Sequence, residues 1–257
     1  MSIQIQDYEA RLTETEDERR LVRRLRYKCF VEEEGASVIP EMKRLREEWD
    51  EFDVRADYMV VFHKKKVVGT YRIITREIAK KSGFYTETEF NLKKIKRVRK
   101  HIAEMSRACV DSEYRDNAMV IRMLWMGLAE YVKQKNIKLL FGVASWHGAN
   151  PNASAQALSY LYYKHLAPPL LRPAVITKNF AKGVDKKLGK MNLLPRKAVS
   201  ENLAFAQMSP LIRGYLRLGA EFGRGVFVDR PFNTYDVFVI LRIKKLAPTY
   251  RRHFMGE

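Results

Sequence analysis

The stretch EMSRACVDSEYRDNAMVIRMLWMGL, residues 104–128, decides the fold. Its beginning has the composition of a short strand, predicted over 103–110. The apolar residues that follow recur at helical spacing and predict an amphipathic helix over 117–136. The next run, IKLLFGVAS at 137–145, has the length and composition of a buried strand. A strand, a helix and a second strand in this order are typical of an α/β sheet flanked by helices.

Three polar residues, Glu104, Ser106 and Arg107, lie at the start of this stretch. Residues two apart on a strand share a face, so Glu104 and Ser106 point one way, and Arg107 points the other way unless a bulge intervenes. Charged side chains on a buried strand cost free energy unless they are paired or used. One interpretation is an ion pair that ties the strand to a neighbouring helix. The other is a carboxylate that accepts a proton beside a cation that orients it.

The same patterns predict the other elements of the chain. We expect a helix through the acidic opening and residues 21–35, a hairpin over 58–74, helices over 153–166 and 209–223, and a last strand over 232–243. A hairpin that leads into a strand, a helix and another strand gives a mixed sheet flanked by helices. We find no Gly-rich dinucleotide fingerprint and no phosphate-binding loop of the Walker type.

Composition sets the broad class. The chain has 257 residues, of which 46% are hydrophobic, so it is long and apolar enough to bury a core. Its two cysteines, Cys29 and Cys109, lie in apolar surroundings, which favours buried structural thiols in a reducing, cytoplasmic compartment. No signal peptide and no apolar run of membrane-spanning length is visible. The histidines show no metal-ligand spacing, so we expect no metal site.

The net charge of +18 indicates an anionic partner: nucleic acid, an anionic membrane surface or an acidic carrier protein. Much of the charge lies at 93–101 and 178–197. Neither stretch has interleaved aromatic residues, and no nucleic-acid-binding signature is present, so we expect no nucleic-acid partner.

A second polar group is the run WDEFDVRADY, which carries four carboxylates in eight residues, Asp50, Glu51, Asp53 and Asp57. Packing acids together costs free energy unless a cation lies among them. The run is therefore either a solvated loop or a pocket for a positively charged substrate.

Four motifs, LRYKCFVEEEG, DEFD, VVGTYRI and EMSRACV, resemble in order and spacing the signature of the acyl-homoserine-lactone synthases. These are GNAT-like acyltransferases that use acyl carrier protein. The resemblance places that family's site residues on Arg26, Phe30, Asp50, Asp53, Arg72, Glu104 and Arg107.

The C-terminal half resembles a narrower family. ANPNASAQALSYLYYKHLAPP and SPLIRGYLRLGAEFGRGVFVDRPFNTYDVFVIL are similar to the ornithine-lipid N-acyltransferases. These place a 3-hydroxy fatty acyl group on the α-amine of ornithine to give lyso-ornithine lipid, the first step of ornithine lipid biosynthesis. The resemblance, from about residue 8 to 243, implies a single GNAT-like α/β domain over 1–257 with a mixed central sheet. An extension at about 168–257 is expected to complete the sheet and the lipid or carrier surface.

One departure from the general GNAT pattern concerns the acyl donor. Where acetyltransferases have a Gly-rich loop for the coenzyme A pyrophosphate, this chain has RDNAMV at 115–120. Both glycines are missing, and Asp116 would repel a pyrophosphate. We therefore expect no bound cofactor, with the acyl-phosphopantetheine of acyl carrier protein as donor. The expected carrier contacts are Arg115, Lys96, Arg97 and Arg99.

The resemblance implies catalytic and substrate-binding roles for the residues of both polar groups. Glu104 is the candidate base for the amine, with Arg107 and Ser106 beside it, and Tyr160, Tyr162 or Tyr163 protonates the leaving thiolate. The substrate-binding set is Arg26, Phe30, Asp50, Asp53 and Arg72, in which Asp50 and Asp53 bind the side-chain ammonium of ornithine. A lipid product and the basic stretches 93–100 and 178–190 lead us to expect a peripheral protein on the inner membrane.

Three alternatives stay open. The first is a lactone synthase that uses S-adenosylmethionine. The second is an N-acyltransferase for another amine, such as glycine or lysine. The third is a basic module that binds lipid or nucleic acid without chemistry.

Overall fold

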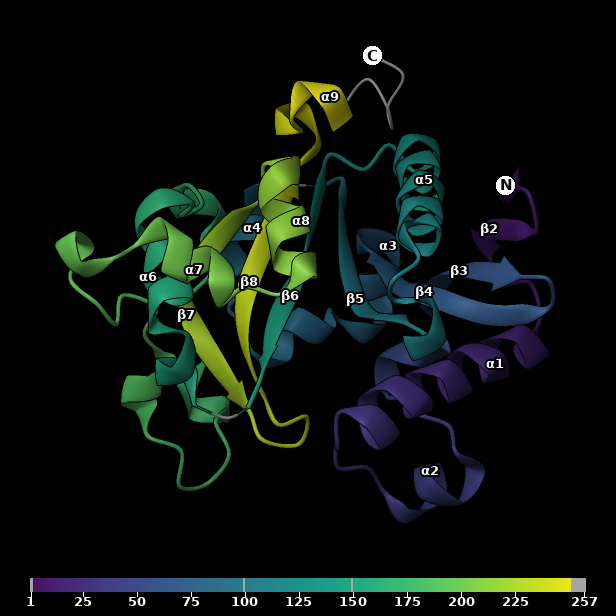
Figure 1. The fold of residues 1–257 in the computed structure, drawn as a ribbon, viewed down its shortest axis with the longest axis horizontal. Helices are drawn as coiled ribbons and strands as arrows, with labels where there is room; N and C mark the ends of the chain where they lie inside the picture. The colour runs from purple at the N-terminus through teal and green to yellow at the C-terminus, as the bar shows by residue number, and fades with distance from the viewer. Residues whose placement is uncertain (1, 99, 149, 251–257) are drawn as a thin grey trace. The chain divides into compact units, whose positions relative to one another are not determined.

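A computed structural model describes residues 2–98, 100–148 and 150–250 (Figure 1). The chain forms two compact units. The first contains residues 2–84, 103–137 and 249–250, and the second contains 85–102 and 138–248, with residue 99 and residue 149 outside the description. No helix among the described residues is long and apolar enough to cross a membrane.

The first unit is built on an antiparallel sheet whose order follows the chain. Its strands are β1 (Ser2–Ile5), β2 (Tyr8–Leu12), β3 (Asp57–His63), β4 (Lys66–Thr75) and β5 (Ile102–Val110). The predicted hairpin is β3 and β4, and Lys64 in its turn takes a left-handed φ of 58°. The centre of the sheet is β3 and β4, whose side chains are almost all buried.

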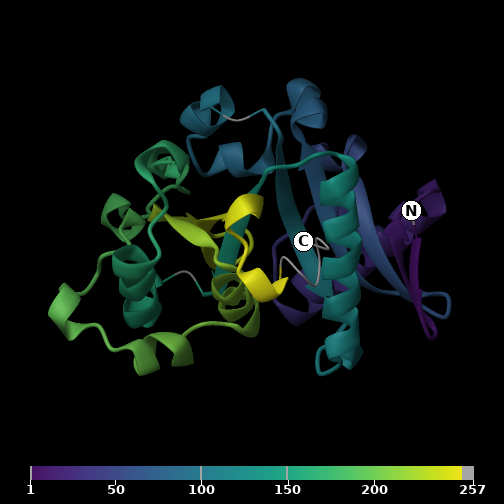
Figure 2. The same cartoon turned by 90° about the horizontal axis from the view of Figure 1, so that it is seen from above.

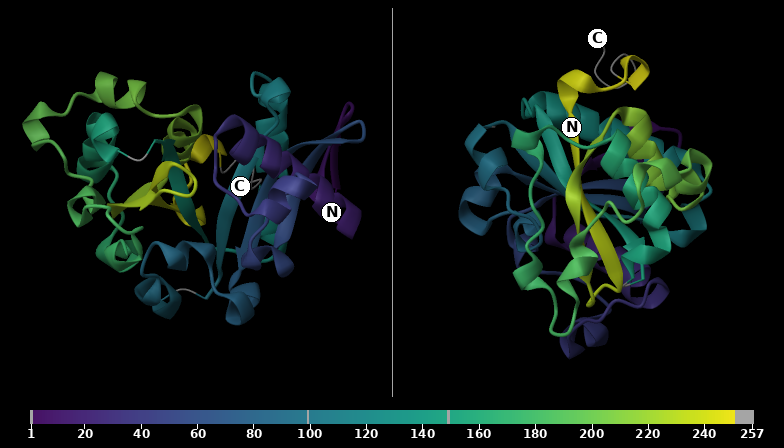
Figure 3. Two further views of the ribbon diagram at one scale, coloured as in Figure 1. Left: turned by 90° about the horizontal axis from the view of Figure 1, so that it is seen from below. Right: turned by 90° about the vertical axis from the view of Figure 1, so that its left-hand side faces the viewer.

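Two long helices, α1 (Glu16–Arg26) and α5 (Ala118–Gln134), cover this sheet. Seen from above, α5 lies across the strands (Figure 2), whereas α1 lies across them when the unit is seen from below (Figure 3, left). The α5 side requires a close approach, because a Cβ atom on Gly127 would lie 2.5 Å from the sulfur of Met59. The polar residues of the sheet face α1, at whose end Arg26 reaches Tyr58 of β3.

The chain after α1 widens into a π-helix and then turns back over the sheet. The helix continues as a π-helix over Tyr27–Glu33 and is followed by α2 (Pro40–Leu45) and a 3₁₀ turn over Glu51–Val54. The turn begins with a capping box: the Asp50 carboxylate accepts the backbone N–H of Phe52, and the Asp53 carboxylate accepts the backbone N–H of Asp50. This cap fixes the two carboxylates in place. The unit is completed by α3 (Arg76–Ser82).

The second unit has a three-stranded antiparallel sheet in the order β6, β8, β7. Its strands are β6 (Leu139–His147), β7 (Glu221–Asp229) and β8 (Thr234–Arg242), so the segment after residue 168 supplies two of them (Figure 3, right). The helices are α4 (Lys93–Val98), α6 (Ala155–Lys164), α7 (Glu201–Ala206) and α8 (Pro210–Leu218), and α9 (Pro248–Tyr250) ends the described chain. The helix α6 packs against both β7 and α7.

The α/β class is as predicted, but several elements differ from the prediction. The opening is a hairpin of β1 and β2 rather than helix, because Tyr8 and Ala10 alternate into the core. The helix starts only at Glu16, where Thr15 caps it. The helix predicted over 209–223 ends at Leu218, because Gly219 takes a left-handed φ of 87°. The following residues form β7, which we did not predict.

Candidate active site

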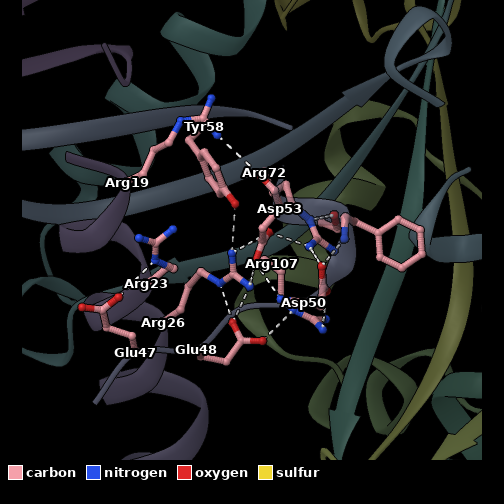
Figure 4. Close-up of polar contacts among 12 residues, drawn as sticks. Arg19, Arg23, Arg26, Glu47, Glu48, Asp50, Asp53, Tyr58, Arg72 and Arg107 are labelled. Carbon is pink, nitrogen blue, oxygen red and sulfur yellow. Dashed lines mark hydrogen bonds and ion pairs between the residues drawn. The ribbon is translucent and has the colours of Figure 1, made fainter. Parts of the chain in front are cut away.

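A row of polar side chains crosses the first unit's sheet. Tyr58 on β3, Arg72 on β4 and Ser106 on β5 are direct cross-strand neighbours, so their side chains share one face. The Nε of Arg72 donates to the Ser106 hydroxyl at 3.0 Å. From α1, Arg26 donates to the Tyr58 hydroxyl at 3.4 Å (Figure 4). The row therefore joins three strands to the end of a helix.

A β-bulge brings Arg107 to the same face. Thr70 pairs with Cys109 and Arg72 pairs with Ser106, so two residues of β5, Arg107 and Ala108, lie opposite one residue of β4. Arg107 has a left-handed φ of 51°, which costs a non-glycine residue roughly 1–3 kcal/mol. The bulge thereby overrides the strict alternation of the strand. Ser106 and Arg107 both join one polar cluster.

Two carboxylates of the capped turn bind the three arginines. Asp53 accepts from Arg26 at 2.9 Å and from Arg72 at 2.8 Å. Asp50 accepts from Arg72 at 2.5 Å and from Arg107 at 3.1 Å (Figure 4). Arg26 and Arg72 have no exposed surface, so their charges depend on these partners.

Sequence reasoning missed one member of the cluster, Glu48. It is buried, contacts Arg26 at 2.5 Å and lies 3.3 Å from the Nε of Arg107. The sequence does place Glu48 close to the predicted residues, because in EEWDEFD it lies two residues before Asp50. Nothing in that run marks which acid turns inward. The pairing with Arg26 depends on α1 lying beside the loop.

The electrostatics follow from burial among guanidinium groups. Burial alone would raise the pKa of Asp53, but the charges of Arg26 and Arg72 outweigh it and hold that pKa far below its ordinary value. Burial also acts to raise the pKa of Glu48, and Arg26 and Arg107 lower it instead. Both acids are therefore ionised at neutral pH. The cluster is a charge-balanced lattice that fixes β5 against the 48–53 loop.

The four acids of the run WDEFDVRADY have different surroundings. Asp50 and Asp53 do lie around cations, but those cations are arginines of the protein itself. Asp57 is bound differently, since it accepts the Tyr131 hydroxyl at 2.6 Å, and Glu51 is exposed. The solvated-loop interpretation is wrong for Asp53. Asp50 keeps a fifth of its side chain accessible to solvent.

Glu104 and Phe30 complete the predicted set in the first unit. Glu104 lies opposite Ile74 of β4 and has no exposed surface. It is two residues from Ser106, with no bulge between them, so it lies on the same face of β5. Phe30 is half-buried on the π-helix. The structure thus brings Arg26, Asp50, Asp53, Arg72, Ser106 and Arg107 together and places Glu104 next along the strand.

The predicted leaving-group residues belong to the second unit. Tyr160 on α6 is buried, and its ring packs against His165 and Phe205. Burial, and then the nearby charge of Glu201, raises the pKa of Tyr160. The Tyr163 hydroxyl donates to the carbonyl of Leu194. The hydroxyls of Tyr160 and Tyr163 are therefore held in different surroundings.

The predicted carrier contacts are divided between the units. Lys96 pairs with Glu87 at 2.7 Å and Arg97 is exposed, both in the second unit. Arg99 lies outside the described residues. In the first unit, Arg115 donates to the carbonyl of Val110 and pairs with Glu33. The carrier assignment stays a prediction.

Other groups that could carry chemistry lie outside this cluster. Cys29 and Cys109 are buried thiols, as predicted. In the second unit, oxygens of Glu89, Asp229 and Asp236 lie within 4.8 Å of one another, which is close enough to hold a metal ion. Each of these acids already interacts with another group of the protein, so we assign no metal to them.

Comparisons with known proteins agree with this architecture. Residues 25–126 match the family described as Acetyltransferase (GNAT) domain. The chain is 37% identical to an L-ornithine N(alpha)-acyltransferase of Rhodobacter capsulatus, over 96% of this chain and 94% of that protein. It is 33% identical to one of Brucella abortus, over 97% of this chain and 89% of that protein.

Among solved structures, an N-acyl amino acid synthase from uncultured soil microbes is similar with a TM-score of 0.48 and 13% identity, over 93% of this chain and 92% of that one. The family match over residues 25–126 agrees with the predicted GNAT-like class, and the curated relatives identify an acyltransferase. Its matched region includes the arginine cluster and β5. By its identity to the curated relatives over nearly its whole length, the chain belongs to the L-ornithine N(alpha)-acyltransferase family.

Proposed function

We propose that the protein transfers a 3-hydroxy fatty acyl group from acyl carrier protein to the α-amine of ornithine, giving lyso-ornithine lipid. The observation that carries this proposal is the near-full-length identity to relatives that bear the ornithine acyltransferase name. It disfavours a lactone synthase and a module without chemistry. A glycine or lysine acceptor is the second candidate within the same reaction class.

The reaction is attack of a neutral amine on a thioester carbonyl, after which the C–S bond breaks. A free α-amine is mostly protonated at neutral pH, so a base or a water held by a base must remove a proton. Glu104 is our candidate because it is a carboxylate on β5, close to the bulge and shielded from solvent. The amine's proton passes to Glu104 as the C–N bond forms. The departing thiolate takes up a proton from solvent, and Tyr160, which lies in the second unit, stays a sequence prediction for that step.

The bulge offers a second function to β5. An extra residue in one strand leaves backbone groups out of the ladder. We propose that an N–H freed at Arg107 or Ala108 donates to the oxyanion that develops on the thioester oxygen. Arg107 itself is held by Asp50 and Glu48, so the strand keeps its shape while charge develops nearby.

The cluster suggests different roles for the two acids predicted to bind ornithine. Asp53 already accepts from Arg26, Arg72 and the backbone N–H of Asp50, which suits a positioning residue. Asp50 is partly exposed, which suits contact with the substrate's side-chain ammonium. Asp50→Asn is expected to raise mainly the KM for ornithine, whereas Asp53→Asn is expected to lower stability. Equal KM values for wild type and Asp50→Asn would remove that role.

The start of α5 supports a carrier-bound donor. In GNAT enzymes this helix start receives the pyrophosphate of coenzyme A, as the motif resemblance implies. Here the Asn117 side chain accepts the Met119 N–H and so occupies the helix start, and Asp116 precedes it. A phosphopantetheine carries a single phosphate and no pyrophosphate. We therefore propose acyl carrier protein rather than coenzyme A as donor.

The test is mass spectrometry of the products formed by purified protein with 3-hydroxyacyl carrier protein and a pool of amino acids. We expect an acyl-ornithine. An acyl-lysine or acyl-glycine product would support the same reaction class but with a different amine acceptor. The same reaction run with 3-hydroxyacyl-coenzyme A should be at least 10-fold slower, and an equal rate would contradict the carrier assignment.

We also propose that the protein contacts an anionic membrane surface through basic residues at 93–100 and 178–190. The support is the exposure of Lys178, Lys182, Lys186 and Lys187, together with a lipid product. Binding to anionic vesicles should then weaken steeply between 50 and 300 mM salt, on the order of 10-fold or more. Binding that ignores salt would contradict this proposal.

A further inference from the structure

The second unit contains a pocket of about 370 Å³ that is separate from the polar cluster of the first unit. It lies where β7 meets the basic segment that follows α6. Its lining includes the polar side chains of Tyr162, Lys190, Asn192 and Arg224. The volume is in the range of small-ligand sites.

The floor of the pocket is fixed by backbone contacts. Lys190 and Gly225 form an antiparallel bridge, and the 3₁₀ turn over Lys186–Gly189 packs on β7. A Cβ atom on Gly225 would lie 2.7 Å from Val175, so only glycine permits this approach. The basic loop is therefore held against the sheet, which fixes the backbone of Lys190 and of Arg224 at the pocket.

The polar side chains that line the pocket are all hydrogen-bond donors. The ammonium of Lys190, the guanidinium of Arg224, the Tyr162 hydroxyl and the Asn192 amide can each donate a hydrogen bond. The lining residues include no carboxylate. Within the described part of the chain, none of these four side chains makes a hydrogen bond or an ion pair. By contrast Arg242, on the adjacent strand β8, is paired with Glu221.

The surrounding charge has the same sign. Lys178, Lys182, Lys186 and Lys187 are exposed on the same segment. The acid in this run, Asp185, accepts the backbone N–H of Lys187 and caps its turn. A guanidinium fork and an ammonium that line one pocket with neutral donors match the oxygens of a phosphate group.

We infer that this pocket binds a phosphate monoester or diester. The same chemistry is offered by a phospholipid headgroup and by a small soluble phosphate ester. The inference goes beyond the proposed acyl transfer and does not depend on it, since neither the donor nor the amine is needed for binding.

The test uses the full chain and three variants. Lys190→Ser/Arg224→Ser removes the two cations, and Ala174→Phe fills the pocket without changing charge, because Ala174 is an exposed lining residue. The matched control, Lys244→Ser/Lys245→Ser, removes two exposed charges of the same unit that lie outside both the lining and the basic stretches proposed to contact the membrane. Thermal melts establish that each variant is folded. The probes are phosphatidylglycerol vesicles, phosphatidylcholine vesicles and sn-glycerol 3-phosphate.

We expect both pocket variants to weaken binding of a phosphate probe at least 10-fold and the control to weaken it less than 3-fold. If the pocket variants lose binding to either kind of vesicle, and wild type shows no measurable binding of glycerol phosphate, the pocket is a headgroup site. Loss of glycerol phosphate binding identifies a site for soluble esters. The inference is overturned if the control variant loses as much affinity for a phosphate probe as the pocket double variant. It is also overturned if Ala174→Phe binds the probe with wild-type affinity, or if wild type binds no probe. None of these outcomes bears on acyl transfer, which is measured separately.

Discussion

Arginine is used in opposite ways in the two units. In the first, Arg26, Arg72 and Arg107 are held by acids and have little or no contact with solvent. In the second, Arg224 is exposed at a pocket whose lining offers it no acid. A buried, neutralised guanidinium fixes backbone in place, whereas an unpaired one at a pocket is available to a ligand. The difference separates charges that hold the fold from the charges that we propose for recognition.

The largest expected effect is at Arg26. Arg26→Met leaves Glu48 and Asp53 as buried charges with one partner fewer, and breaking such a pair costs about 3–5 kcal/mol. The free energy of unfolding, from urea titration, measures the loss. The control is Arg24→Met on the same helix, where half of the side chain is exposed and its ion pair with Glu47 is 3.5 Å long. A loss at Arg26 no larger than at Arg24 would mean that the cluster does not hold the unit together.

The next effect is at Asp53. Asp53→Asn removes a charge that accepts from two guanidinium groups, for a loss of roughly 1.5–3 kcal/mol at neutral pH. The pKa of Asp53 is lower in the folded than in the unfolded chain, where it is about 4. Its contribution is therefore complete above about pH 5 and declines as the pH falls below the unfolded value.

Urea titrations of wild type and Asp53→Asn between pH 3 and 7 measure this dependence. The gap between them should narrow as the pH falls. A gap that stays constant over that range would show that the carboxylate charge is not what stabilises the fold.

A smaller effect isolates the bulge. Both Arg107→Ala and Arg107→Gly lose the contacts to Glu48 and Asp50, but only glycine takes the left-handed φ of 51° without strain. Arg107→Gly should therefore be more stable than Arg107→Ala by about 1 kcal/mol. Calorimetric melts of the pair give this difference, and an alanine variant as stable as glycine would argue against backbone strain at this site.

The smallest expected effect is at the pocket. Lys190→Ser/Arg224→Ser removes two surface charges without ion-pair partners among the described residues, so unfolding free energy should change by less than about 0.5 kcal/mol. Denaturant titration against wild type checks this. A loss above 2 kcal/mol would place these residues in the fold rather than in recognition, and the contrast between the units would fail.

Several features of the site could be predicted from sequence. The motifs that resemble the lactone synthases identified Arg26, Asp53, Arg72 and Arg107, all of which the fold brings together. Strand alternation predicted that Arg107 would point away from Ser106 unless a bulge intervened. The structure has that bulge, and Arg107 joins the same cluster as Ser106. Local patterns did not identify Glu48, because its inward direction depends on where α1 lies.

The missed strands have a physical reason. The β1 and β2 hairpin is short and partly exposed, so its alternation is weak among charged residues. The β7 strand contains Gly223 and Gly225, which discourage a strand prediction. Gly225 is there because Val175 lies against it, a contact that only the folded chain reveals. These strands are therefore set by tertiary contacts, which the local composition does not show.

The most direct test of the account is the turnover of Glu104→Gln with 3-hydroxyacyl carrier protein and ornithine. The variant keeps the size of the buried side chain but removes the base, so kcat should fall on the order of 10²–10⁴-fold, with stability unchanged within about 1 kcal/mol. Glu130→Gln, a partly exposed acid on α5, should keep wild-type turnover. A Glu104→Gln enzyme that acylates ornithine at the wild-type rate would contradict the assignment of the chemistry to β5.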